Sequence, residues 1–162
     1  MSDIVQPKGT HLAQLNVARA LDDLESPRLA GFMAALDGVN AVAERSPGFV
    51  WRLKSDAGNA TDIKVLDDVR YIINMSVWES AAHLEQFVWN TVHARVYEKK
   101  ATWFEAPKTP HLVMWFVPAG HRPTADEAME RLAHLTAHGP SAHAFGWESL
   151  PNVKLWMSKR CA

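Results

Sequence analysis

The sequence has little of several features that mark particular classes of protein. It contains a single cysteine in 162 residues, Cys161, so neither an intrachain disulfide nor a cysteine-based metal site can form. No run approaches the roughly 18 apolar residues that span a membrane. The N-terminal segment also lacks the apolar core of a signal peptide. These absences favour a protein of the reducing cytoplasm with no membrane partner.

A surplus of charge of either sign is absent as well. The chain has 17 Lys and Arg against 18 Asp and Glu, and its basic residues are scattered rather than clustered. Without a basic patch we expect no nucleic-acid partner. Glycine-rich phosphate loops, a nucleophile elbow and a Rossmann fingerprint are also missing, which disfavours nucleotide-dependent chemistry.

What the chain does contain is the composition of one ordinary globular domain over residues 1–162, with 48% hydrophobic and 22% charged residues. Period-two alternation predicts strands at 10–18, 49–54, 69–78 and 112–117, and a shorter strand at 144–148. Helical spacing predicts helices at 28–45, with a break near Asp37 and Gly38, at 81–104, and at 125–138. Thr124 to Glu127 resembles a capping box for the last helix, which Gly139 and Pro140 close.

The order of these elements predicts the fold class. Strand, helix, strand, strand, helix, strand is the βαββαβ order of a ferredoxin-like α+β fold, an antiparallel sheet with both main helices on one face, here with an extra C-terminal helix. The other sheet face then needs a cover, and a second copy of the same sheet is the simplest one. We therefore expect a homodimer, in which two sheets form a dimeric α/β barrel.

Several segments of the chain carry a resemblance to a known family. They read MSVWES at 75–80, FV at 87–88, His93, WF at 103–104, LVMWFVPAGH at 112–121, EA at 127–128, RL at 131–132, GP at 139–140 and AF at 144–145. In this pattern the chain resembles the uncharacterised DUF3291 family. The wider group that it resembles is the dimeric α/β-barrel superfamily, which includes antibiotic-biosynthesis monooxygenases and heme-degrading oxygenases. The resemblance implies a pocket between sheet and helices in each subunit, but no particular reaction.

The same resemblance points to three residues by element. The heme-degrading enzymes use an Asn on the first strand and a Trp and a His on the helix after the third strand, where this chain has Asn16, Trp89 and His93. The spacing between Trp89 and His93 is much shorter than in those enzymes. If this segment is a single helix, both residues lie beside its apolar stripe, one turn apart. His93 is then a ligand or general base next to an aromatic wall. Alternatively, it is a histidine at a subunit contact or in solvent.

Polar residues on two strands form a second candidate site. Gln14 and Asn16 face Asn74, Ser76 and Trp78 if the first and third strands pair in the ferredoxin-like order. Amides and a hydroxyl beside an indole could orient a planar oxygenated substrate and stabilise an enolate-like anion. They could equally fill the barrel side of the sheet or form hydrogen bonds across the dimer.

Three further residues are candidates for catalysis or substrate binding. Arg95 falls near the middle of the apolar stripe, where it needs a carboxylate partner or an anionic ligand. His121 follows a strand and a turn, a position that carries function in many proteins or serves only to cap the next helix. Trp115 lines an aromatic pocket or belongs to the core. We expect no metal site, since His134 and His138 lack a third ligand nearby in sequence.

Three hypotheses for function follow. The first is a cofactor-independent oxygenase of the antibiotic-monooxygenase type, acting on an aromatic or polyketide-like metabolite that Asn16, Trp78, His93 and His121 position or deprotonate. The second is a heme-binding protein with His93 or His121 as axial ligand. The third is a non-catalytic accessory protein that sequesters a metabolite.

Overall fold

A four-stranded antiparallel sheet forms the centre of the computed structural model, which describes residues 3–54, 68–151, 153 and 155. The strands are β1 (Thr10–Arg19), β2 (Phe49–Arg52), β3 (Tyr71–Trp78) and β4 (Leu112–Pro118), in the spatial order β2-β3-β1-β4. β1 and β2 are both antiparallel to the strand between them, so each βαβ unit is split by a third strand. This confirms the ferredoxin-like α+β prediction.

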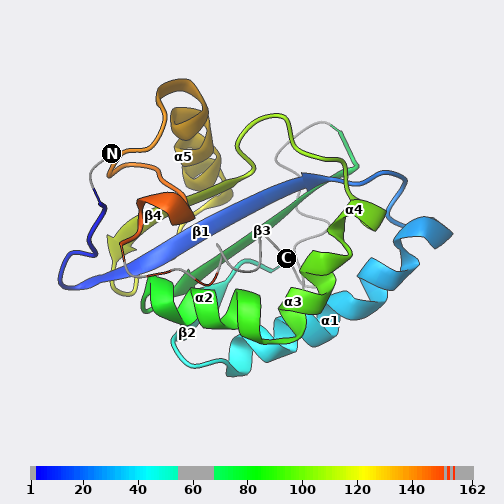
Figure 1. Cartoon of the computed structure of the whole chain (residues 1–162), viewed down its shortest axis with the longest axis horizontal. Helices are drawn as coiled ribbons and strands as arrows, with labels where there is room; N and C mark the ends of the chain where they lie inside the picture. The colour runs from blue at the N-terminus through cyan, green and yellow to red at the C-terminus, as the bar shows by residue number, and fades with distance from the viewer. Residues whose placement is uncertain (1–2, 55–67, 152, 154, 156–162) are drawn as a thin grey trace.

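Helices cover both faces of this sheet. A short 3-10 turn, η1 (Pro27–Leu29), leads into α1 (Ala30–Arg45), and the polypeptide between β3 and β4 forms α2 (Ala81–Asn90), α3 (Val92–Glu98) and α4 (Lys100–Trp103). These helices lie below the sheet in Figure 1, whereas α5 (Ala125–His138) lies above it. The expected break of α1 near Asp37 and Gly38 is wrong, because α1 is continuous from Ala30 to Arg45.

Strand alternation divides the core between the two faces. Ala13, Leu15 and Val17 of β1 share a buried cluster with Leu132 and Leu135 of α5. The alternate residues of β1 face α1 to α3, and the antiparallel register places them opposite the polar residues of β3. The cross-strand pairs on this second face are Leu12 with Trp78, Gln14 with Ser76, and Asn16 with Asn74.

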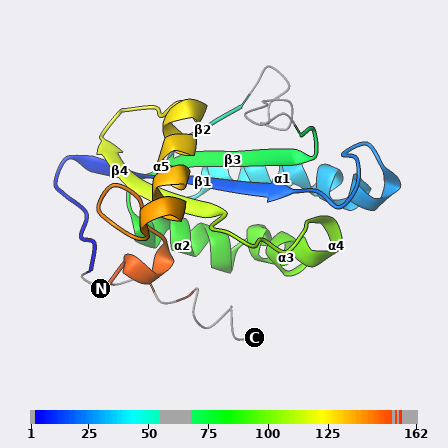
Figure 2. The same ribbon diagram turned by 90° about the horizontal axis from the view of Figure 1, so that it is seen from above.

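The position of α5 shows that the second face of the sheet is not left entirely for a partner subunit to cover. In Figure 2 α5 crosses the sheet, and it packs on β4 and β1, so this chain supplies part of the cover for its own second face. A second copy is not required to bury Leu15, Val113 and Trp115, each of which has no exposed area in the single chain. The homodimer stays a prediction, which sedimentation velocity at micromolar concentration tests.

The expected single helix over 81–104 is wrong, because Thr91 interrupts it. Thr91 has extended backbone angles (φ −126°, ψ −171°). Its hydroxyl donates to the carbonyl of Phe87 at 2.6 Å and accepts from the backbone N–H of His93 at 3.2 Å. One side chain thus ends α2 and caps the start of α3. The directions of the side chains after Thr91 therefore differ from those expected for a single helix.

The C-terminal part differs from prediction in one element. Residues 144–148 do not form a strand of the sheet, because Phe145 makes only an isolated bridge with Met114 and the chain then turns into η2 (Trp147–Ser149). Thr124 caps α5 and Gly139 ends it with φ +76°, as expected. The predicted connection at 55–68 and the apolar tail at 153–157 lie largely outside the described residues. No helix in the described part of the chain could cross a membrane.

Candidate functional site

An open cavity of about 1330 Å³ has as its main walls α1 to α3 and the face of the sheet on which these helices pack. Its sheet wall contains Gln14, Asn16, Asn74, Ser76 and Trp78. Its helix wall is formed mainly by α1, α2 and α3, and the segment 104–111 forms a rim. The same open volume continues around the sheet to Leu132 and Gly139, so only part of it lies between the sheet and these helices.

A hydrogen-bonded polar network lies on the floor of the cavity. The amide nitrogen of Gln14 donates to Oδ1 of Asn74 and to Oγ of Ser76, both at 2.8 Å. The indole nitrogen of Trp78 donates to the same Oγ at 2.8 Å. Both amide hydrogens of Gln14 are therefore used, which leaves its Oε1 and the Ser76 hydroxyl hydrogen without a partner among the described residues. These two groups are available to a ligand.

His93 lies in the helix wall with one ring nitrogen held and the other free. Its Nδ1 is 3.2 Å from the carbonyl oxygen of Val88. Because a carbonyl can only accept, Nδ1 carries the hydrogen and Nε2 of the neutral ring has a lone pair. Burial lowers the pKa of His93, although the Val88 hydrogen bond acts in the opposite direction. The ring is thus a neutral base or ligand at the cavity wall.

The helix break at Thr91 creates this arrangement. Val88 is in the last turn of α2, where carbonyl groups lack helical donors, and His93 satisfies one of them from α3. The expected position of Trp89 and His93 one turn apart on a single helix is therefore wrong, because they belong to α2 and α3. His93 packs against Phe87, with ring centroids 5.1 Å apart, and Trp89 packs edge-on against Tyr97 at 4.9 Å.

Asn40 of α1 is a cavity residue that the sequence patterns did not single out. The residue is 7% exposed and borders the cavity. Its amide makes no hydrogen bond to any described residue, so it can bond to a polar atom of a ligand. Asn40 looks like one more polar position of an amphipathic helix, and no signal in the sequence distinguishes it from the solvent-facing ones.

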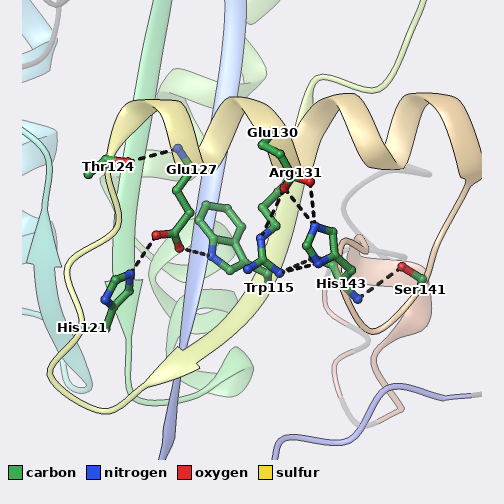
Figure 3. Close-up of polar contacts among 8 residues, drawn as sticks. All are labelled: Trp115, His121, Thr124, Glu127, Glu130, Arg131, Ser141 and His143. Carbon is green, nitrogen blue, oxygen red and sulfur yellow. Dashed lines mark hydrogen bonds and ion pairs between the residues drawn. The ribbon is translucent and has the colours of Figure 1, made fainter.

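The structure places three of the predicted site residues away from the cavity. Arg95 is exposed, so its expected position in the apolar stripe is wrong, and it borders a shallow groove between α1 and α3. Trp115 and His121 belong to the α5 side of the sheet, as Figure 3 shows. Asn16, Asn74, Trp78, Trp89 and His93 do border the same cavity.

On the α5 side, Glu127 joins Trp115 to His121. Oε2 of Glu127 accepts from the Trp115 indole at 2.9 Å, and Oε1 lies 2.8 Å from Nε2 of His121 (Figure 3). Desolvation alone would raise the pKa of Glu127, but the hydrogen bonds from His121 and Trp115 outweigh it and the pKa is lowered. These three side chains lie in 112–128, where the segments that resemble the DUF3291 family follow one another most closely.

A family model described as a domain of unknown function, DUF3291, matches residues 11–161. The chain belongs to the DUF3291 family. Comparison with curated proteins found no match for this DUF3291 chain.

Three solved structures are similar in outline. A protein of unknown function from Nitrosomonas europaea (NE2512) is 16% identical with a TM-score of 0.48, over 74% of this chain and all of the other. A provisionally assigned antibiotic biosynthesis monooxygenase from the same organism has 12% identity, a TM-score of 0.45, and coverage of 72% and 96%. PA3566 from Pseudomonas aeruginosa has 13% identity, a TM-score of 0.45, and coverage of 69% and 96%. The fold described above rests on the strand order and register of this chain alone.

A histidine cluster lies on and beside α5 in the DUF3291 chain, and Nδ1 of His134 within it is buried without a hydrogen-bond partner among the described residues. The rings of His134 and His143 lie 4.6 Å apart. Nδ1 of His143 accepts from Arg131 at 3.0 Å, so Nε2 carries the hydrogen that Glu130 accepts at 2.9 Å (Figure 3). Both nitrogens of His143 are therefore occupied. Among the residues that the structure describes, no group of three or more His, Cys, Asp or Glu is placed to hold a metal ion.

Proposed function

We propose that this DUF3291 protein is a small-molecule enzyme, a cofactor-independent oxygenase of the antibiotic-monooxygenase type that acts on an aromatic or polyketide-like metabolite. The observation that carries the proposal is the state of His93. A neutral imidazole with Nδ1–H held by Val88 has its Nε2 lone pair free at the wall of a cavity that also contains aromatic rings. A base of this kind can take the proton of a bound phenol.

The chemistry needs no nucleotide, because the substrate supplies the electrons. A phenolate reacts with dioxygen to give a quinone and one water, which balances as phenol plus O₂ to quinone plus H₂O. His93 takes the phenolic proton at Nε2, and one oxygen atom of O₂ bonds to a ring carbon as the O–O bond breaks. The hydrogen of that carbon and the proton from His93 leave with the second oxygen atom as water. Gln14, Ser76 and the amides of Asn16 and Asn74 offer polar atoms that orient the oxygenated ring as negative charge develops.

Oxygen consumption with phenolic and hydroquinone compounds tests this function. We expect the wild-type protein to consume oxygen in proportion to quinone formed, and His93→Gln to reduce the rate by roughly 100-fold or more, the range for loss of a general base. His138→Gln is the matched control, because His138 is exposed on α5 and does not border the cavity. Equal rates in the two variants, or no turnover by the wild type, would contradict the proposal.

A second candidate, heme binding, is favoured by the same free nitrogen. Nε2 of His93 has a lone pair and no hydrogen-bond partner among the described residues, as an axial ligand requires. Hemin titration distinguishes the two histidines that the sequence suggested. A Soret band that is lost in His93→Gln and kept in His121→Gln would support His93 as the ligand, and a flat titration would exclude this function.

Non-catalytic sequestration is the third outcome of these experiments. A phenolic ligand that binds tightly but is recovered unchanged after long aerobic incubation would assign the cavity to storage or delivery instead of oxidation.

A further inference from the structure

The charged side chains that border the cavity are not equally neutralised. Arg19 is paired with Asp68 at 2.8 Å and with Glu105 at 2.7 Å, and Arg52 is paired with Glu44 at 3.2 Å. Lys100 and Lys108 also border the cavity, and neither has a carboxylate partner among the described residues. Lys100 and Lys108 therefore place unpaired positive charge beside and on the rim segment 104–111.

This segment lies at the open end of the cavity. The polar residues of β1 and β3 become more exposed toward this end of the cavity. Gln14 is 5% and Ser76 7% exposed, whereas Asn16 is half-buried and Asn74 is exposed. The carbonyl of His111 accepts from the backbone N–H of Val17, next to Asn16. The rim residue His111 is thus beside the mouth, and the Gln14–Ser76 pair is at the inner end.

Lys100 is held close to this mouth. Its Nζ lies 3.8 Å from the ring centroid of Tyr97, another cavity residue. Burial lowers the pKa of His111, and the charge of Lys100 lowers it further, so Lys100 is near enough to act on that ring. Two acidic residues border the cavity, and Glu105 is paired with Arg19. The other, Glu148, is in η2, where its neighbour Trp147 packs with Leu12 at the other end of β1.

We infer that the ligand of this cavity is an organic anion whose apolar body lies along Phe87 and Val88 and whose charged group lies at Lys100. The inner walls fit the apolar part, because the side chains of Phe87 and Val88 border the cavity and neither is fully buried. The amide of Asn40, which makes no hydrogen bond to a described residue, fits a polar atom on that body. The inference rests on the proposed function only in taking this cavity as the substrate site, and it names the substrate class.

Binding of a charged and a neutral form of one ring system tests the inference. The probes are 1-naphthoate and 1-naphthamide, titrated against the full chain by calorimetry near physiological ionic strength. Lys100→Gln removes the charge at the mouth, and Lys99→Gln removes an adjacent charge that borders the shallow α1–α3 groove instead of the cavity. Circular dichroism verifies that both variants are folded.

We expect 1-naphthoate to bind more tightly than 1-naphthamide. Lys100→Gln should weaken binding of 1-naphthoate by roughly 1.5-fold to fivefold, the range for an exposed ion pair, and should leave binding of 1-naphthamide unchanged. Lys99→Gln should change neither. Equal affinities for the two probes, no binding of 1-naphthoate, or equal effects of the two lysine variants would overturn the inference. Charge-selective binding without oxygen consumption would remove the oxygenase function and leave this inference standing.

Discussion

The indole nitrogen of Trp115 donates a 2.9 Å hydrogen bond to Oε2 of Glu127, which joins the centre of β4 to the first turn of α5. Trp115 has no exposed area, so water cannot replace this acceptor. The other carboxylate oxygen is paired with His121. Glu127 was expected to complete a capping box with Thr124, but only the Thr124 half forms, because the Glu127 side chain turns toward the sheet.

Replacing Glu127 should destabilise the fold through Trp115. Glu127→Ala leaves the buried indole N–H without an acceptor, at a cost of about 1–3 kcal/mol in free energy of unfolding. Glu127→Gln keeps an acceptor oxygen and should cost less. Urea denaturation at neutral pH measures both, and the expectation fails if the Ala and Gln variants are equally stable.

The lowered pKa of Glu127 also predicts a pH dependence. A carboxyl whose pKa is lower in the folded state contributes stability that is present above its ordinary value of 4.5 and is lost as the pH falls through the lower folded-state value. Wild-type stability should therefore fall more steeply below pH 4.5 than that of Glu127→Gln. Parallel curves for the two proteins would show that Glu127 does not contribute in this way.

Ser76→Ala should damage the cavity floor. The Ser76 hydroxyl accepts from both Gln14 and Trp78, so the Ala variant leaves two buried donors short of an acceptor. We expect a loss of about 1–3 kcal/mol in urea denaturation. Thr136→Ala is a useful control, since Thr136 is exposed and its hydroxyl bonds only to Leu132 of its own helix. A similar small effect in both variants would contradict the role assigned to Ser76.

Asn40→Leu should separate stability from function. Replacing this amide, which makes no hydrogen bond to a described residue, should leave the thermal midpoint nearly unchanged, because no hydrogen bond of the fold is lost. The same variant should weaken binding of the substrate or of 1-naphthoate severalfold. A variant that loses stability and keeps full binding would show that Asn40 supports the fold and does not contact the ligand.

The pKa of His93 sets the pH range of the proposed reaction. Burial lowers this pKa below its ordinary value of 6.5, so the base stays unprotonated as the pH falls through 6.5. The pH profile of kcat/KM should therefore stay flat at pH 6.5 and fall only at lower pH. An inflection at or above pH 6.5 would indicate that a group other than His93 is the base in the reaction.

Local patterns in the sequence were sufficient for much of the fold. Alternation over β1 and β3, together with antiparallel pairing, predicted that Gln14 and Asn16 face Asn74, Ser76 and Trp78, and the register confirms it. The limits of α5 were predicted from Thr124 and Gly139, because capping depends on residues adjacent in the chain. The alternation of these strands and the two caps of α5 depend on neighbouring residues, so the sequence predicted them.

Tertiary structure decided the rest of the candidate site. A threonine such as Thr91 can lie inside a helix or cap one. Its hydrogen bonds to Phe87 and His93 show that it caps α3. Arg95 is consequently exposed, and the ring of His93 is held by Val88. Asn40 borders the cavity because α1 packs on that face of the sheet. Trp115 and His121 do not border it, because they lie on the face that α5 covers. The positions of these three residues depend on packing between segments far apart in the chain, which no local pattern encodes.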